Sequence, residues 1–276
     1  MSDFIKCGVI GFPVSHSLSP TIHSYWIKQY NLSGSYEALA IEPSNLLQDV
    51  RALFAAGYVG LNVTIPHKQA ILELCDEVDF AAQKIGAVNT LIHGGGRVRG
   101  TNTDADGFLN NIRQAQPGFD FAAGPALVLG AGGAARAVIH ALQTVGVPRI
   151  ILTNRTAETA AALAAEFGIE TLPWELRDKG ACNLNLLVNT TSLGMTGKPD
   201  LSFDVSGLDK STLVNDIVYV PARTRLLQDA ASHGNVVVEG LGMLLHQARP
   251  AFAHWFGVMP DVTTDLEHLL QEKLAP

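Results

Sequence analysis

A glycine-rich turn near the middle of the 276-residue chain is the first stretch whose residue types point to chemistry. The apolar run 126–129 leads into Gly130-Ala131-Gly132-Gly133-Ala134, and a helical pattern follows immediately. In such a turn the glycines let a phosphate approach the backbone, and the helix N-terminus offers free N–H groups to a pyrophosphate. We therefore predict dinucleotide binding, with a tight turn that binds nothing as the alternative.

The strand that follows this helix indicates which dinucleotide is bound. It covers residues 149–153 and ends in Asn154-Arg155-Thr156, without the Asp or Glu that NAD enzymes usually place there for the ribose hydroxyls. A guanidinium can instead bind a 2′-phosphate through two parallel hydrogen bonds. The residues favour NADP over NAD, although a helix cap at Thr156 beside a solvated Arg155 would give the same sequence.

Polar clusters in the N-terminal part of the chain mostly follow predicted strand ends, where open α/β sheets bind ligands. The clusters are Ser15-His16-Ser17-Leu18-Ser19, 62–68, 86–90 and 100–104. A helix cap at Ser19, before Pro20, explains one serine but not three serines and a histidine in five residues. Hydroxyl groups at strand ends suit a ligand that itself carries hydroxyls or a carboxylate.

Lys68 and Asp104 are the charged residues of these clusters. The pattern predicts a helix over 68–75, which puts Lys68 in a first turn, where a positive charge opposes the helix dipole. Local structure then gives no reason for this lysine, and we favour a functional role over a solvated surface charge. Asp104 precedes a predicted helix at 107–113, so the alternative to a functional role is that it simply caps this helix. For Asn89 and Asn102 the alternative is that they satisfy buried backbone groups.

Short apolar runs alternate with longer amphipathic segments, which predicts the elements that position these groups. Strands are expected at 5–11, 36–41, 60–65, 87–92 and 97–101, and in a second series at 126–129, 149–153, 184–189, 212–216 and 236–239. The glycines of 94–96 are expected to turn a hairpin. The predicted fold class is α/β, with an open, mostly parallel sheet domain that binds substrate and a Rossmann-type dinucleotide-binding domain.

We assign residues 1–106 to the substrate domain, completed by the helical segment 241–276, and residues 107–240 to the dinucleotide-binding domain. The stretch 114–124 contains Pro, Gly and small residues and is the best candidate for a join between domains.

Composition excludes several classes of partner. A net charge of −7 gives no electrostatic footprint for nucleic acid or an anionic membrane. No apolar stretch reaches the roughly 18 residues of a membrane span. We expect no metal, because metal-ligand spacing is missing among Cys7, Cys75, Cys182, His16, His23, His67 and His246. Unpaired thiols suit the cytoplasm. The sequence leaves the oligomeric state open, and a homodimer is compatible with it.

Seven motifs, in this order, resemble signatures of the shikimate dehydrogenase family, and the resemblance runs from about residue 8 to residue 248. They are His16-Ser17-Leu18-Ser19-Pro20, Asn62-Val63-Thr64-Ile65-Pro66-His67-Lys68, 85–90, 100–104, 130–134, 154–156 and 239–247. The resemblance implies a two-domain enzyme that interconverts 3-dehydroshikimate and shikimate by reversible NADP-linked hydride transfer. This reaction belongs to the biosynthesis of chorismate and the aromatic amino acids.

The resemblance also implies roles for individual residues. Lys68 and Asp104 would form the acid/base pair. The implied substrate-binding residues are Ser17, Ser19, Thr64, Lys68, Asn89, Asp104, Tyr219 and Gln247. The implied cofactor-binding residues are Gly130, Ala131, Gly132, Gly133, Ala134, Asn154, Arg155, Thr156, Ile217 and Gly240, the last two at the nicotinamide end.

Two departures from the family pattern keep rival interpretations open. Thr159 stands where the family often has Lys or Arg, which weakens the NADP prediction without reversing it, and Ser24 follows His23 where the family favours Asn. One rival is a relative that prefers NAD or also oxidises quinate. Another is a nucleotide-sensing module without catalysis, which would have to explain Lys68 and Asp104.

Overall fold

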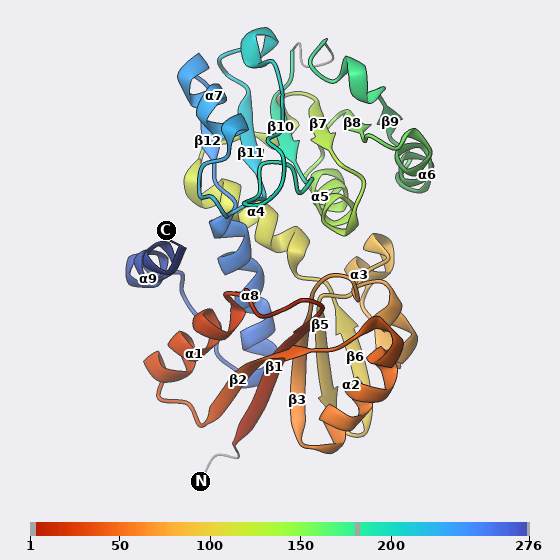
Figure 1. The fold of residues 1–276 in the computed structure, drawn as a ribbon, viewed down its shortest axis with the longest axis vertical. Helices are drawn as coiled ribbons and strands as arrows, with labels where there is room; N and C mark the ends of the chain where they lie inside the picture. Colours follow the sequence, from red (N-terminus) through yellow and green to blue (C-terminus); the bar gives the residue numbers. More distant parts are fainter. Residues whose placement is uncertain (1–3, 180–182, 275–276) are drawn as a thin grey trace. The chain divides into compact units, whose positions relative to one another are not determined.

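The computed structural model describes residues 4–179 and 183–274, which form two compact units. The first unit consists of Met1–Asp104 and Leu245–Ala275, and the second of Ala105–Leu244. The chain passes from one unit to the other inside two helices, α4 (Asp104–Ala115) and α8 (Leu241–Phe256) (Figure 1).

The candidate join at 114–124 is wrong, because this stretch lies within the second unit. Its Pro and Gly belong to the loop between α4 and β7. Across the described residues, no helix combines the length and the apolar character needed to cross a bilayer. Of the cysteines, Cys7 is buried and Cys75 is partly exposed, while Cys182 lies outside the described residues.

The first unit is built on a mixed six-stranded sheet in the order β2-β1-β3-β5-β6-β4. Its strands are β1 (Ile5–Gly11), β2 (Gly34–Ala40), β3 (Tyr58–Val63), β4 (Glu77–Val78), β5 (Thr90–Gly94) and β6 (Arg97–Thr101). β1 pairs in parallel with both β2 and β3, whereas β5 is antiparallel to β3 and β6. The predicted hairpin joins β5 to β6, with Gly95 and Gly96 at positive φ.

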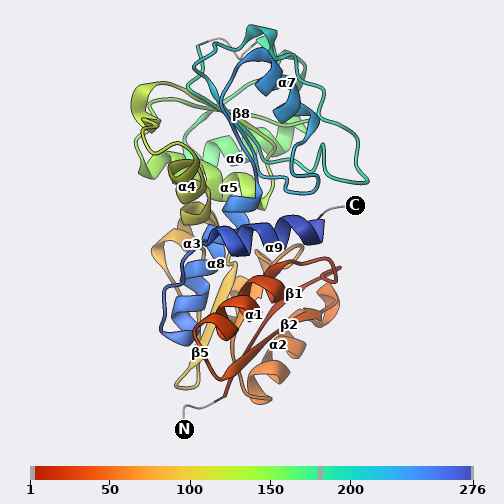
Figure 2. The same cartoon turned by 90° about the vertical axis from the view of Figure 1, so that its left-hand side faces the viewer.

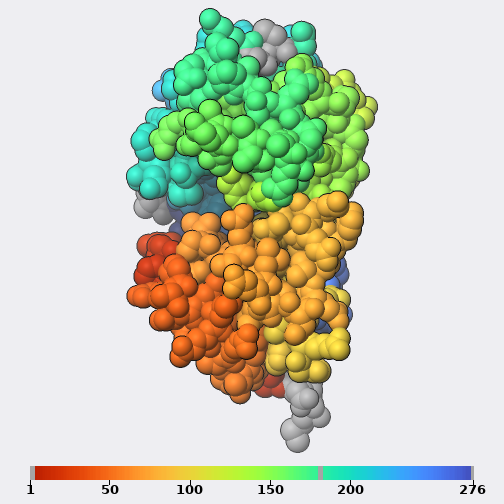
Figure 3. Space-filling view, turned by 90° about the vertical axis from the view of Figure 1, so that its right-hand side faces the viewer, coloured from red at the N-terminus to blue at the C-terminus, as the bar shows by residue number. Residues whose placement is uncertain are grey.

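Helices cover both faces of this sheet. They are α1 (Ser19–Gln29), α2 (Leu46–Ala55), α3 (Phe80–Ile85), the 245–256 part of α8, and α9 (Thr264–Leu274). Apolar residues of α2 pack with Ile10 and Leu61 of the sheet in one buried cluster. On the side of the first unit that Figure 3 shows, the surface is formed largely by orange segments of the chain, which include α2.

The predicted helix over 68–75 is wrong. The chain forms a turn after β3 and then a short 3-10 helix, η2 (Ala70–Leu74), which begins beyond Lys68. The carbonyl of Lys68 accepts a hydrogen bond from the N–H of Val88, 2.8 Å away, while the N–H of Leu72, its α-helical partner, donates to the carbonyl of Gln69 instead. Lys68 therefore does not oppose a helix dipole, and its role follows from its contacts.

The C-terminal helices complete the first unit by packing on the opposite side of the sheet from α2. Trp255 of α8 lies against Gly60 of β3, and its Nε1 donates to the carbonyl oxygen of Leu91, 3.0 Å away. Gly60 and Leu61 face opposite sides because successive strand residues alternate. Trp26 of α1 packs edge-on against Phe252 of α8, and α1 also contacts α9 (Figure 2).

Replacing Gly60 with alanine is expected to lower the free energy of unfolding by about 1–3 kcal/mol. A Cβ at this position would overlap the Trp255 indole, so α8 would have to move off the sheet. Gly94→Ala in β5 is the matched control, because its Cβ would meet no atom within 4 Å. Urea denaturation followed by tryptophan fluorescence measures both, and equal stability of the two variants would contradict this packing.

The second unit contains a six-stranded sheet in the order β12-β11-β10-β7-β8-β9, and its neighbouring strands pair in parallel throughout the described residues. The strands are β7 (Ala126–Leu129), β8 (Ile150–Thr153), β9 (Glu170–Thr171), β10 (Leu186–Asn189), β11 (Leu213–Asp216) and β12 (Val237–Val238). This is the strand order of the doubly wound dinucleotide-binding fold, which reverses between β7 and β10. The predicted α/β fold class is confirmed.

Three helices of this unit connect its parallel strands: α5 (Gly133–Thr144), α6 (Ala157–Phe167) and α7 (Arg225–His233). The 105–115 part of α4 precedes the first strand, and the 241–244 part of α8 follows the last. Every residue of β7, β10 and β11 is buried. Such strands read as continuous apolar runs, which is why the sequence shows them so clearly.

Candidate active site

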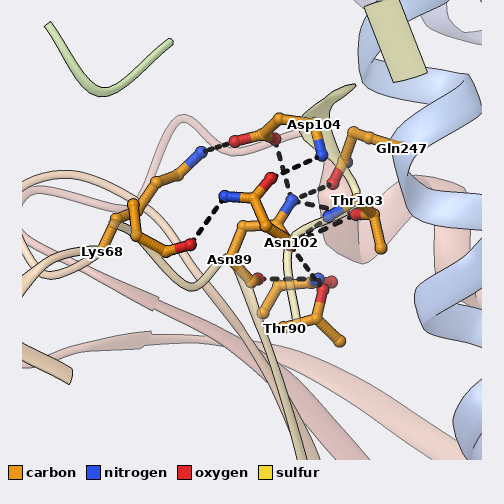
Figure 4. Close-up of polar contacts among 9 residues, drawn as sticks. Lys68, Asn89, Thr90, Asn102, Thr103, Asp104 and Gln247 are labelled. Carbon is orange, nitrogen blue, oxygen red and sulfur yellow. Dashed lines mark hydrogen bonds and ion pairs between the residues drawn. The ribbon is translucent and has the colours of Figure 1, made fainter. Parts of the chain in front are cut away.

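Lys68 and Asp104 form an ion pair in the first unit (Figure 4). Lys68 lies in the turn after β3, and Asp104 is the first residue of α4, three residues after β6 ends at Thr101. The Nζ of Lys68 is 2.5 Å from Oδ2 of Asp104, and the side chains are 20% and 9% exposed. The pair is thus largely shielded, yet the ammonium can still be reached by a small ligand.

Asn89 fixes the orientation of the Asp104 carboxylate. The buried Asn89 donates from Nδ2 to Oδ1 of Asp104 at 2.8 Å and to Oγ1 of Thr103 at 2.9 Å. Gln247 of α8 accepts a longer bond from the same nitrogen, at 3.4 Å. Both carboxylate oxygens are therefore used by side chains, and Asn102 supplies the acceptor for the N–H of Asp104, at 3.0 Å. Capping is not what Asp104 does here.

A chain of buried hydrogen bonds continues from Asn89 into the sheet. The hydroxyl of Thr90 donates to Oδ1 of Asn89 at 2.9 Å, and Nδ2 of Asn62 donates to that hydroxyl oxygen at 3.1 Å. The hydroxyl of Tyr36 donates to Oδ1 of Asn62 at 2.6 Å. Asn62 and Thr90 belong to polar clusters that the sequence shows, whereas Tyr36 opens the predicted strand 36–41 and its contact with Asn62 comes from strand pairing.

The predicted hydroxyl residues lie at neighbouring strand ends of the same unit. Ser17 and Ser19 follow β1, Thr64 follows β3, and these two strands pair in parallel, so their carboxyl ends meet at one edge. Ser19 is not the N-cap that was predicted: it is already the first residue of α1, and its N–H donates to Oγ of Ser17 at 3.2 Å. The hydroxyl of Ser19 is therefore not used to cap the helix.

The fully buried His23 of α1 makes the stability of the fold depend on pH. Its ring stacks on Tyr36 with the centroids 4.0 Å apart, and burial lowers its pKa from 6.5 to about 3. Between these values the unfolded chain binds a proton that the folded chain does not, so stability is full above pH 6.5 and falls as the pH decreases. His246, whose pKa burial lowers to about 4, adds to this loss.

We expect His23→Phe, which keeps an aromatic ring against Tyr36, to remove one proton's share of this slope. That share averages about 1 kcal/mol per pH unit between pH 5 and pH 7 and approaches about 1.4 kcal/mol per pH unit only well below pH 6.5. Urea denaturation of the wild type and the variant between pH 5 and pH 7 measures the difference. The same slope in both proteins would show that His23 is not kept neutral by the fold.

The glycine-rich turn of the second unit follows β7, where the strand order reverses. Gly130 has a φ of +102°, and a Cβ there would lie 2.9 Å from Oγ1 of Thr190, so this position requires glycine. Gly132 and Gly133 are exposed at the start of α5, and a Cβ on either would meet nothing within 4 Å. The turn thus leaves room for a phosphate beside free helix N–H groups.

Asn154, Arg155 and Thr156 follow β8. Asn154 and Arg155 line a cavity of about 570 Å³ together with Thr191 and Ser192 of the loop after β10. Asn154 donates to the carbonyl oxygen of Thr156 at 3.0 Å, and Thr156 sits at the N-cap position of α6 without a side-chain capping bond. The cavity lies within the second unit, beside residues predicted to bind the 2′-phosphate.

The loop after β11 places Ile217 next to Gly240. A Cβ at Gly240 would overlap the carbonyl of Ile217, so this approach also requires glycine. The buried Asp216 holds the loop: its carboxylate accepts from Nδ2 of Asn189, at 3.0 Å, and from the hydroxyl of Thr224, at 2.7 Å. Burial raises the pKa of Asp216 and that of the Tyr219 hydroxyl.

The fold and these two groups of residues place the chain among two-domain α/β enzymes with a dinucleotide-binding unit. Family models agree. A shikimate dehydrogenase substrate-binding domain matches residues 9–91, a shikimate/quinate 5-dehydrogenase domain matches 113–192, and a shikimate 5′-dehydrogenase C-terminal domain matches 240–270. The chain belongs to the shikimate dehydrogenase family.

Individual relatives support the same assignment. The NADP(+) shikimate dehydrogenase of Paramagnetospirillum magneticum is 50% identical over 262 residues, which cover 94% of this chain and 95% of the relative. A shikimate 5-dehydrogenase structure from Thermus thermophilus, in complex with NADP(H) and shikimate, has a TM-score of 0.87 at 37% identity, covering 98% and 100% of the two chains. A quinate dehydrogenase from Corynebacterium glutamicum in complex with NAD has a TM-score of 0.88 at 32% identity, covering 97% and 99%.

Proposed function

We propose that this chain catalyses the reversible NADP-linked interconversion of 3-dehydroshikimate and shikimate, within the biosynthesis of chorismate and the aromatic amino acids. Membership of the family supports the reaction, and the shielded Lys68–Asp104 pair is the observation that carries the mechanism. In this proposal the first unit binds shikimate and the second binds NADP. A protein that only sensed the nucleotide would not need the Lys68–Asp104 pair or the hydroxyl residues at the strand ends of the same unit.

Lys68 and Asp104 act as the acid/base pair that transfers the hydroxyl proton of the substrate. Oxidation of the ring alcohol releases a hydride and a hydroxyl proton, and bound NADP supplies the nicotinamide carbon that takes the hydride. In this direction the neutral amine form of Lys68 accepts the hydroxyl proton and becomes the ammonium that pairs with Asp104, and in reduction the ammonium donates the proton back. Asp104 shares the hydrogen bond to the same hydroxyl and positions Nζ of Lys68. Asn89 keeps the Asp104 carboxylate turned toward the ammonium.

The remaining substrate contacts come from groups that can bond to a carboxylate and to hydroxyls. Ser17 and Ser19 supply hydroxyl donors at the end of β1, and Thr64 supplies another at the end of β3. Asn89 and Gln247 offer amide groups beside Asp104. Tyr219 is proposed as a further substrate ligand.

The second unit fits NADP in three places. The turn from Gly130 to Ala134 offers the open space and free N–H groups that a pyrophosphate needs. Asn154, Arg155 and Thr156 are proposed to hold the 2′-phosphate, beside the cavity that the first two of them line. Ile217 and Gly240, held together by the loop after β11, are proposed to contact the nicotinamide end.

A spectrophotometric assay of the purified protein tests the function. Shikimate with NADP⁺ should give the absorbance of reduced nicotinamide, and 3-dehydroshikimate with NADPH should remove it. Parallel reactions with NAD⁺ and with quinate test the rival preferences, and we expect lower kcat/KM in both. No reduction of NADP⁺ with shikimate would contradict the proposal.

We also propose a cytoplasmic location, which rests on the free thiols of Cys7 and Cys75. The proposal leaves both a monomer and a homodimer open, and sedimentation of the purified chain decides between them.

A further inference from the structure

The loop after β10 is held in a fixed shape in the second unit. The N–H of Gly194 donates to the carbonyl of Pro199 at 2.7 Å, and the N–H of Lys198 donates to the carbonyl of Met195 at 2.8 Å. Gly194 and Gly197 have positive φ angles of 87° and 80°. The N–H of Thr196 ties the loop to the carbonyl of Val220 at 2.8 Å. The backbone that carries Lys198 is therefore well anchored.

Lys198 lines the same cavity of about 570 Å³ as Arg155. A third cation there, Arg177, is already engaged: it donates to the carbonyls of Trp174 and Ser202 and lies 3.6 Å from Oδ1 of Asp178. In the part of the chain that the structure describes, neither Arg155 nor Lys198 makes a side-chain hydrogen bond or ion pair. Two uncommitted positive charges thus face one cavity.

Asp200 is the acidic residue of this cavity lining, so its charge has to be weighed against theirs. The pKa of the Arg225 guanidinium is raised mainly by its ion pair with Asp229 and, in smaller part, by Asp200. Asp200 therefore also interacts with Arg225, a cation that does not line the cavity. Arg155 and Lys198 keep the balance of the cavity positive.

We propose that Lys198 is a cofactor-specificity residue that binds the 2′-phosphate of NADP together with Arg155. This inference rests on the proposed use of NADP. A phosphate monoester carries nearly two negative charges at neutral pH, and one guanidinium neutralises only one of them. The first turn of α6 offers no cation for the second charge, since Thr159 stands there. Lys198, in the loop after β10, supplies it as a point charge.

Ligand binding tests this inference without catalysis, by comparing two ligands that carry the 2′-phosphate with two that lack it. We expect Lys198→Ala to weaken the binding of 2′,5′-ADP and NADP⁺ by about 5- to 10-fold, as for the loss of one charge-assisted hydrogen bond. Binding of 5′-AMP and NAD⁺, which lack the 2′-phosphate, should stay unchanged. Lys198→Glu should weaken the binding of 2′,5′-ADP further, because it places a negative charge beside the phosphate. Isothermal titration calorimetry on the full chain measures all four ligands.

Lys210→Ala is the matched control, since Lys210 is an exposed lysine of the same unit that does not line the cavity. Wild-type affinity of Lys198→Ala for 2′,5′-ADP would overturn the inference, as would an equal loss for 5′-AMP. Failure of the proposed function looks different: the wild type would then not reduce NADP⁺ with shikimate, whatever Lys198 does to 2′,5′-ADP.

Discussion

Lys68→Met is expected to lower kcat for shikimate oxidation by about 100-fold or more, because the variant has no group to accept the hydroxyl proton. Methionine has a similar length and should fill the same half-buried position. The KM for shikimate should change far less than kcat if the other hydroxyl-binding residues still hold the ring. Steady-state kinetics with saturating NADP⁺ measure both constants.

Lys6→Met, a substitution at an exposed lysine of β1, is the control for loss of a positive charge in the same unit. It should behave as the wild type. Near-normal turnover of Lys68→Met would remove Lys68 from the proton transfer, and the mechanism would then need another base.

Arg155→Ala is expected to lower kcat/KM for NADP⁺ by about 10- to 100-fold, because a bidentate, charge-assisted contact to the 2′-phosphate is lost. With NAD⁺, which has no such phosphate, kcat/KM should stay close to the wild-type value. The ratio of the two constants, measured at one ionic strength, is the relevant readout because exposed charges are screened by salt.

Arg113→Ala, at an exposed arginine of α4 in the same unit, controls for the general loss of positive charge. An equal loss of kcat/KM with both cofactors in Arg155→Ala would mean that Arg155 does not distinguish them. In that case the NADP preference would have to come from elsewhere in the cavity.

The parts of the fold that could be predicted depend on local sequence. The run Ala126–Leu129 is buried on both faces and ends at glycines that only one kind of turn explains, so its strand, turn and helix were all predictable. The same holds for the hairpin at Gly95 and Gly96, whose positive φ angles favour glycine. Short strands such as β4 and β9 have only two residues and carry no period to detect.

The parts that could not be predicted depend on contacts between distant residues. Lys68 lies in a turn whose carbonyl bonds to the N–H of Val88, a contact that no local pattern reveals. Tyr36 of β2 contacts Asn62 of β3 because both strands pair with β1, which lies between them. The register of these pairings cannot be inferred from the sequence of either strand alone. The motif residues Lys68, Asn89 and Asp104 were each identified, but their mutual geometry required the fold.

In the proposed mechanism Lys68 and Asp104 act on one hydroxyl of the substrate. A crystal structure of the chain with shikimate bound would show whether they do. We predict that Nζ of Lys68 and a carboxylate oxygen of Asp104 both lie within about 2.6–3.2 Å of the same ring oxygen. Shikimate bound with that oxygen turned away from either group, or held elsewhere on the chain, would rule out this pair as the acid/base group.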